Sequence, residues 1–188
     1  MGDLLLAPPA ASGRRDLTAD EFLRLNVEGP HDLIDGRVVS RRYSSMVKGA
    51  VCATIGCVLH ARVPRDRWRA FLRVGVVCGT APDSVIAPDF AVSVRRPIRD
   101  GFSTVPPVIA GYVRCPSAMN ECFKERVSRL LSVGLREIWI LDPDTREAEV
   151  FRPDGPMRRV LSDGRFETDE LPGFSASLTE CFEDLDAE

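Results

Sequence analysis

Two helix-like patterns alternate with short strand-like runs along this chain of 188 residues. Small and apolar residues recur at helical spacing from 45 to 61, and a second apolar face, marked by Phe123, Val127 and Leu130, ends before Gly134. Around them lie apolar runs of strand length that end in turn residues. This alternation predicts a mixed α/β (α+β) domain with one central sheet flanked by helices.

Smaller signals complete the expected order of elements. Thr18-x-x-Glu21 is a capping box and predicts a short helix over 18–25, and the Asp35-Gly36 dipeptide predicts a hairpin over 32–39. A last hairpin is expected around Asp163-Gly164, before a C-terminal helix that opens near Ser177. Single strands are expected over 68–78, 85–94, 108–115, 137–142 and 148–152. We expect 1–16 to form a flexible arm and 17–188 to form one domain.

The charge is divided unevenly along the chain. The formal net charge is -3, but 167–188 hold 8 acidic residues and no Lys or Arg. The preceding residues therefore carry all 25 Lys and Arg against 20 acids, a net charge of +5. A mildly basic body permits a polyanionic partner without requiring one.

The cysteines and the apolar runs restrict the class of protein. Six Cys and two His occur without any Cys-x-x-Cys pair, so buried free thiols are favoured over a zinc site. The run Leu4 to Ala7 is too short for a signal sequence, and no apolar run approaches the roughly 20 residues of a membrane span. We expect a cytoplasmic protein without a membrane partner.

One carboxylate stands at the opening of an apolar strand, in Pro88-Asp89-Phe90-Ala91-Val92. Metal-dependent nucleases hold a divalent cation with such a carboxylate, a further acid on a neighbouring strand and a basic residue. Taken alone, Asp89 also fits a plain turn residue at a strand start, and Pro82-Asp83 repeats the dipeptide nearby.

The order of several short motifs is more specific. The chain contains, in sequence, Asp32-Leu33-Ile34-Asp35-Gly36, Ser44-Ser45, the Asp89 strand, Cys115-Pro116-Ser117, the block from Gly134 to Pro143, and Leu171-Pro172-Gly173-Phe174. Over about residues 17–185 this series resembles the Uma-type family of putative restriction endonucleases in the PD-(D/E)XK nuclease superfamily. The resemblance implies a restriction-endonuclease-like core, with the site at one edge of the sheet, and a homodimer.

Carried over residue by residue, the resemblance implies a site with Asp89 and Asp32 as metal ligands for Mg²⁺. Tyr112 stands where the family has a Glu, Arg126 replaces the family's helix Lys, and Lys48 replaces its His. Tyr112 cannot ligate magnesium as a carboxylate does, and Arg126 stays protonated, so it cannot take part in proton transfer. These departures predict an impaired catalytic site.

Neighbouring helix residues offer a rescue of that site. Glu121, Lys124 and Glu125 come just before Arg126 and are candidates for a migrated acid or Lys. Lys124 lies about 200° around the helix axis from Arg126, so one site cannot take both in a regular helix. The alternative for all three is an ordinary solvated helix face.

Arginines supply candidate phosphate contacts. Arg95, Arg96 and Arg99 follow the Asp89 strand and are expected to flank the site and to contact nucleic acid. A second group lies between residues 62 and 73, interleaved with Trp68 and Phe71, and fits either phosphate contact or the exposed face of a strand.

The leading hypothesis is a nuclease-fold protein that is catalytically impaired and acts by binding nucleic acid or a protein partner. The alternative is an active Mg²⁺-dependent DNA endonuclease that uses Asp89 with Asp32 or with a migrated helix acid. A third class, a structural or regulatory protein, would show no salt-dependent DNA binding.

Overall fold

The computed structural model describes residues 16–25, 28–41, 43–115 and 121–185, so the predicted flexible arm, except Asp16, lies outside the described residues. Its helices are α1 (Ala19–Arg24), α2 (Met46–Arg62), α3 (Glu121–Ser132) and the 3-10 helix η1 (Thr179–Leu185). Its strands are β1 (His31–Ile34), β2 (Arg37–Ser40), β3 (Trp68–Leu72), β4 (Val76–Thr80), β5 (Asp83–Ile86), β6 (Phe90–Val94), β7 (Ile109–Val113), β8 (Glu137–Asp142), β9 (Glu147–Phe151), β10 (Arg158–Val160), β11 (Arg165–Glu167) and β12 (Ser175–Ser177).

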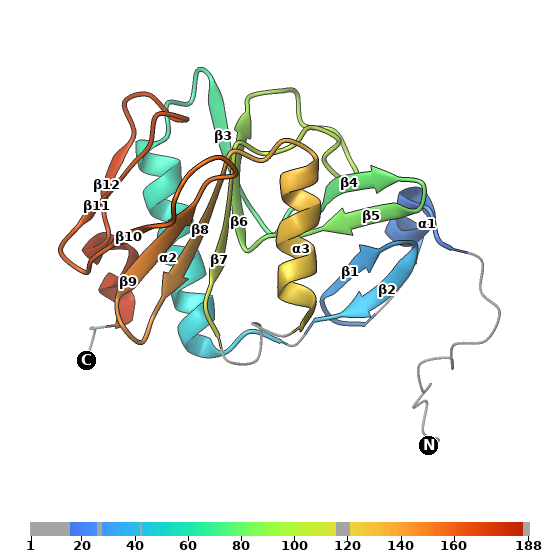
Figure 1. Ribbon diagram of the computed structural model, residues 1–188, viewed down its shortest axis with the longest axis horizontal. Coiled ribbons are helices and arrows are strands. Elements are labelled where there is room, and N and C mark those ends of the chain that lie inside the picture. Colours follow the sequence, from blue (N-terminus) through green and yellow to red (C-terminus); the bar gives the residue numbers. More distant parts are fainter. Residues whose placement is uncertain (1–15, 26–27, 42, 116–120, 186–188) are drawn as a thin grey trace.

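The strands form two main sheets (Figure 1). A six-stranded sheet has the order β10-β9-β8-β7-β6-β3, in which β7 and β8 run parallel and the other neighbours antiparallel. A four-stranded sheet has the order β2-β1-β5-β4, and β11 pairs with β12. The mixed α+β class and the central mixed sheet flanked by helices are confirmed, and the four-stranded sheet beside it is an addition that the sequence did not predict.

Two long apolar runs, each predicted as a single strand, change sheets in the middle. The first run becomes β3 and β4, separated at Arg73, which adopts a left-handed conformation with φ of 52°. The second becomes β5 and β6, separated at Pro88, which lacks the backbone N–H that a continuous ladder needs. Each run contributes one strand to each sheet, and the two breaks therefore join the two sheets.

The C-terminal prediction is corrected in a similar way. A turn forms at Asp163-Gly164, where the Gly164 N–H donates to the Leu161 carbonyl at 2.8 Å. The strands on either side do not pair with each other, because β10 pairs with β9 and β11 with β12. The final helix is the 3-10 helix η1 and not an α-helix.

Other local signals are confirmed. Both halves of the capping box form at the start of α1, with Thr18 and Glu21 each accepting from the other's backbone. Asp35 and Gly36 have φ of 49° and 72°, as the hairpin turn between β1 and β2 requires. Gly134, with φ of 97°, follows α3.

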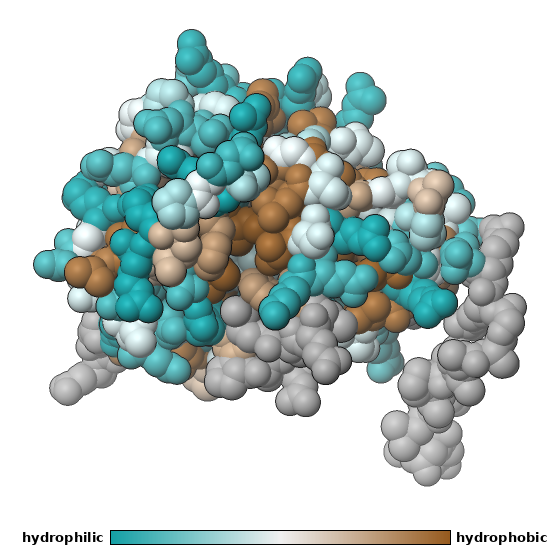
Figure 2. Space-filling view, viewed as in Figure 1, coloured by the Kyte–Doolittle hydropathy of each residue, from teal (hydrophilic) through white to brown (hydrophobic). Residues whose placement is uncertain are grey.

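The six-stranded sheet lies between two helices that cover its opposite faces (Figure 1). Alternate residues of β7 and β8 divide between two apolar clusters, one with α2 and the C-terminal segment and one with α3. Ile109 and Val113 face the α2 side, and Ala110 and Tyr112 face the α3 side. In Figure 2, hydrophilic side chains cover most of the coloured surface, and apolar ones gather around the region of α3. No helix of the described segments is long and apolar enough to span a membrane.

Candidate functional site

Five charged side chains from five separate segments meet where the two sheets adjoin. Two are carboxylates and three are cations, and all are buried or nearly so, with side-chain exposures between 0% and 12%. We call them the charged cluster: Asp32 of β1, Arg41 after β2, Lys48 of α2, Asp89 before β6, and Arg126 of α3.

The backbone fixes both carboxylates. Asp89 Oδ2 accepts from the Val113 N–H at 3.0 Å, and the Asp89 N–H donates to the Gly111 carbonyl at 3.0 Å, so β7 holds Asp89 at both points. Asp32 Oδ1 accepts from the Ala87 N–H at 3.0 Å, which ties β1 to the segment before β6. Both carboxylate positions are therefore set by backbone donors as well as by their cations.

A separate cation holds each carboxylate. Lys48 Nζ lies 2.6 Å from Asp89 Oδ2, and Arg126 Nε lies 2.6 Å from Asp32 Oδ2. Arg41 bridges the two acids, with Nη2 at 3.3 Å from Asp89 Oδ1 and Nη1 at 3.7 Å from Asp32 Oδ1, and it also donates to the Ala87 carbonyl. Among the described residues, three cations face two carboxylates in the charged cluster, a formal excess charge of +1.

Tyr112 of β7 lies next to these charges and remains neutral. Burial, and then the negative charge of Asp32, raise the pKa of its phenol well above the ordinary value. Its hydroxyl is buried and has no hydrogen-bond partner among the described residues. Its ring packs edge-on against Phe123 of α3, with centroids 5.1 Å apart. Tyr112 therefore behaves as an apolar residue beside the charged cluster.

Position 112 faces the charged cluster, whereas position 111 faces the other side of the sheet. A Cβ added to Gly111 would lie 1.8 Å from the Phe90 ring. Position 111 therefore has no room for a carboxylate that could substitute for the one missing at Tyr112.

The helix residues considered as a rescue lie elsewhere. Lys124 and Glu125 are exposed, whereas Arg126 is 3% exposed, as the helical spacing predicts. Within the described part of the chain, no hydrogen bond or ion pair joins Lys124 or Glu125 to the charged cluster. The side chain of Glu121 lies outside the described residues.

Sequence reasoning placed Asp32, Asp89, Tyr112 and Arg126 together, and the structure brings these four together. Lys48 had been noted only as a substituted family position, yet it contacts Asp89 directly. Arg41 was missed. It was visible in the sequence only as the first of two arginines after a strand, a pattern shared with many surface positions.

The three arginines expected to flank this site lie at the other end of β6. Asp89 precedes that strand and Arg95, Arg96 and Arg99 follow it. Five strand residues at about 3.3 Å each separate the two ends by about 17 Å. The expectation that these arginines border the carboxylates is therefore corrected, although all three are exposed.

The donor set does not fit a divalent metal ion. Magnesium favours several oxygen ligands, and carboxylates supply most of them in proteins. Here both carboxylates are engaged by cations, the third family position is a neutral phenol, and the described residues contain no group of three or more His, Cys, Asp or Glu that could hold a metal. A cavity of about 290 Å³, lined in part by Arg41 and Ala87, adjoins the charged cluster.

A mixed sheet between helices, with Asp32 and Asp89 at the junction of two sheets, defines a restriction-endonuclease-like nuclease fold. The family model described as "Putative restriction endonuclease" matches residues 19–179, and the chain belongs to this family. The crystal structure of a putative nuclease belonging to DUF820 from Anabaena variabilis ATCC 29413 matches with a TM-score of 0.74 and 21% identity. That match covers 89% of this chain and 98% of the Anabaena chain. No curated protein matches the chain.

Proposed function

We propose that this protein binds nucleic acid and cleaves it slowly or not at all. The observation that carries the proposal is the pairing of both carboxylates with buried cations, Lys48 on Asp89 and Arg126 on Asp32, each at 2.6 Å. In this family site the same carboxylates would hold the metal.

Metal binding would have to break these contacts. Removing the partner of a buried charge costs roughly 3–5 kcal/mol, because the remaining ion is left in a poorly solvated place. A divalent ion at Asp32 and Asp89 would displace Lys48 and Arg126 and add two positive charges to a cluster that already has an excess of one. Both effects weaken metal binding.

The proton-transfer and water-positioning role that the family gives to its helix Lys is not available at position 126. A Lys side chain can exchange a proton, whereas an arginine side chain does not serve as a base in proteins. Its Nε donates to Asp32, which holds the side chain in the cluster. Arg126 therefore supports the carboxylate and does not activate water.

Two observations support nucleic acid as the ligand. The fold is that of nucleases, and the residues before the acidic C-terminal segment carry a net charge of +5. Binding by Lys and Arg to phosphates falls steeply with salt, because counterions are released. A protein partner is the other ligand class that an inactive nuclease fold could serve.

An active Mg²⁺-dependent endonuclease is the second candidate, favoured by the presence of both Asp32 and Asp89 at the junction of the sheets. Incubation of supercoiled DNA with the purified protein and Mg²⁺ or Mn²⁺ separates the two. We expect no nicking above the background of Asp89→Ala protein. Nicking that Asp89→Ala abolishes would show that the protein is an active nuclease.

Restoring the family residues tests the physical cause of the impairment. We expect the triple variant Lys48→His, Tyr112→Glu, Arg126→Lys to bind Mn²⁺ at least about tenfold more tightly than the wild type in calorimetry, a change of about 1.4 kcal/mol. The matched control carries Tyr112→Gln in place of Tyr112→Glu, so it has the same shape without the charge. Equal Mn²⁺ binding by the two triple variants would contradict the role given to position 112.

Nucleic-acid binding is measured separately, by fluorescence anisotropy with labelled single-stranded and duplex oligonucleotides over a series of salt concentrations. We expect an affinity that falls as salt rises. Absence of binding at low salt would rule out nucleic acid as the ligand and leave a protein partner. We also propose a homodimer, which sedimentation would detect as twice the chain mass of 20.8 kDa.

A further inference from the structure

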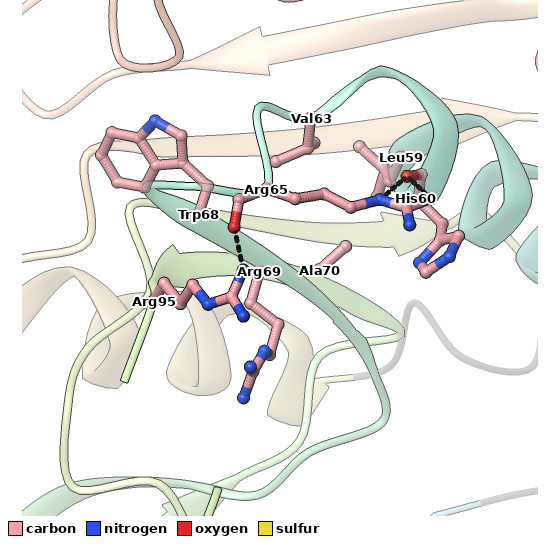
Figure 3. A pocket seen from close by; sticks show the side chains of 8 residues that line it. All are labelled: Leu59, His60, Val63, Arg65, Trp68, Arg69, Ala70 and Arg95. Carbon is pink, nitrogen blue, oxygen red and sulfur yellow. Dashed lines mark hydrogen bonds between the residues drawn. The ribbon is translucent and has the colours of Figure 1, made fainter. Parts of the chain in front are cut away.

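A basic pocket lies at the opposite end of α2 and β6 from the charged cluster (Figure 3). It is a cavity of about 220 Å³ between the C-terminal end of α2 and the edge strand β3. His60, Arg65, Arg69 and Arg95 contribute its polar side chains, and Trp68 lies at its wall. Because Lys48 and His60 are twelve residues apart in α2, the two sites are separated by about 18 Å along the helix.

None of the described residues that line this pocket is acidic. Arg62, the last residue of α2, is paired with Glu180 at 2.8 Å, and Asp66 lies 4.0 Å from Arg67, outside the pocket lining. Among the described residues, no ion pair forms to Arg65, Arg69 or Arg95. Three guanidinium charges therefore gather around one cavity without a carboxylate.

Backbone carbonyls hold these three guanidinium groups in place. Arg65 donates from Nε and Nη2 to the His60 carbonyl at 2.9 and 2.8 Å, and Arg95 donates from Nη1 to the Arg65 carbonyl. Arg69 donates from Nη1 to the Arg96 carbonyl at 3.1 Å. A carbonyl orients a guanidinium without neutralising it, and each group has five N–H donors, so several donors remain for a ligand.

Helix capping explains only part of this arrangement. Arg65 satisfies a carbonyl in the last turn of α2, where a cation is favourable. Arg69 and Arg95 have no such role, since they come from β3 and from the segment after β6. Like charges repel, and gathering them in a concave site is favourable when an anion is bound there.

We infer that this pocket binds a phosphate group of a nucleic-acid backbone. Guanidinium groups match phosphate geometry through paired hydrogen bonds, and Trp68 offers an aromatic face beside them. The exposed Arg67, Arg96 and Arg99 continue the positive charge beyond the pocket, which favours a polymer over a single free phosphate. The inference rests on the proposed function for the source of the phosphate, but it places the contact away from the carboxylates.

The test compares two variants that lose the same charge. Arg69→Gln/Arg95→Gln removes two pocket guanidinium groups, and Arg24→Gln/Arg37→Gln removes two exposed arginines in α1 and β2. In fluorescence anisotropy we expect the pocket variant to bind a labelled oligonucleotide at least about tenfold more weakly than the control variant. The slope of log affinity against log salt should fall in magnitude by about two for the pocket variant only.

A pocket variant that binds like the control, while the wild type binds DNA, would overturn the inference and leave the proposed function standing. A second arm uses inorganic phosphate and the fluorescence of Trp68, which Trp68→Phe assigns because Trp139 is fully buried. If the wild type binds no oligonucleotide, the proposed function is wrong, and the phosphate titration alone then tests whether the pocket binds an anion. A phosphate-dependent change lost in Arg69→Gln/Arg95→Gln supports a phosphate pocket for free anions, and no change overturns it.

Discussion

The Asp89 carboxylate has three contacts in and beside the charged cluster, as the Asp32 carboxylate does. Lys48, Arg41 and the Val113 N–H all contact the Asp89 carboxylate, which is 2% exposed. In a nuclease that binds metal, neighbouring carboxylates repel one another until the metal arrives. Here the carboxylate contributes to the fold, because it neutralises a buried Lys.

The two cases predict opposite effects of Asp89→Asn on stability. Loss of a charge that repels another carboxylate would stabilise the fold, whereas loss of the counter-ion of Lys48 would destabilise it. We expect Asp89→Asn to lower the free energy of unfolding by about 3 kcal/mol, because Lys48 loses its counter-ion in a buried place. Urea unfolding at neutral pH measures the change. The control Asp154→Asn, at an exposed position, should alter stability by less than about 0.5 kcal/mol. Unchanged or increased stability of Asp89→Asn would mean that the carboxylates repel each other in the folded protein.

Two buried thiols make stability depend on alkaline pH. Burial raises the pKa of Cys78 and of Cys181 from 9.0 to about 12. A pKa raised by folding means that stability is complete below pH 9 and is lost as pH rises toward 12. We expect the free energy of unfolding to fall by roughly 2 kcal/mol per thiol between pH 8 and about pH 10.5. Urea unfolding at both pH values tests this, and Cys181→Ala should reduce the dependence.

At the residue scale, the family resemblance, carried over position by position, was sufficient to find the pair of carboxylates and the two altered positions beside them. It could not find Arg41, because that side chain reaches the cluster only through the path of the chain after β2. It also placed Arg95, Arg96 and Arg99 wrongly. Nearness in sequence misled here, since a strand of five residues carries its two ends far apart.

Among the elements, all five residues of β7 are buried, and its two faces make different contacts. Tyr112 packs against α3 beside the charged cluster, while Gly111 lies under the Phe90 ring on the other face. The close approach of β6 and β7, which sets the position of Asp89, depends on the missing side chain at Gly111.

The same chemical change should therefore have opposite effects in two elements. We expect Gly111→Ala to destabilise the protein by about 3 kcal/mol or more, because its Cβ would lie 1.8 Å from the Phe90 ring. Gly49→Ala in α2 meets nothing within 4 Å and should stabilise the protein by about 0.5–1 kcal/mol. Thermal unfolding of both variants checks the pair. A neutral Gly111→Ala would mean that β6 and β7 can separate at little cost.

The elements also show which structural features sequence patterns can predict and which they cannot. Capping residues and turn dipeptides are local, and they predicted α1 and the β1–β2 hairpin correctly. Sheet membership is not local. Nothing in an apolar run states that it will leave one sheet at Arg73 or at Pro88 and enter another, so the division into two sheets could not be predicted from the pattern.

At the scale of the whole molecule, the structure shows where the acidic C-terminal residues lie relative to the basic ones. Acidic residues of the C-terminal segment lie along α2, where Glu180 pairs with Arg62 and Asp184 accepts from Thr54. They neutralise one arginine near the end of the helix and leave Arg65, Arg69 and Arg95 without such partners among the described residues. The acidic C-terminal segment thus contacts α2, but among the described residues it does not neutralise the arginines of the pocket.

Lys48 and Arg126 already neutralise the two carboxylates of the charged cluster. The folded state should therefore need no bound metal ion for its stability. A ligand that binds only the folded state stabilises it by mass action, by about 2.7 kcal/mol when it is present at one hundred times its dissociation constant. With Lys48 and Arg126 in that position, the wild type should melt at the same temperature in a chelator as in about 10 mM MgCl₂. The counter-ions of these carboxylates are side chains of the same chain. The stability of this member of a nuclease family should therefore not depend on the divalent ions around it.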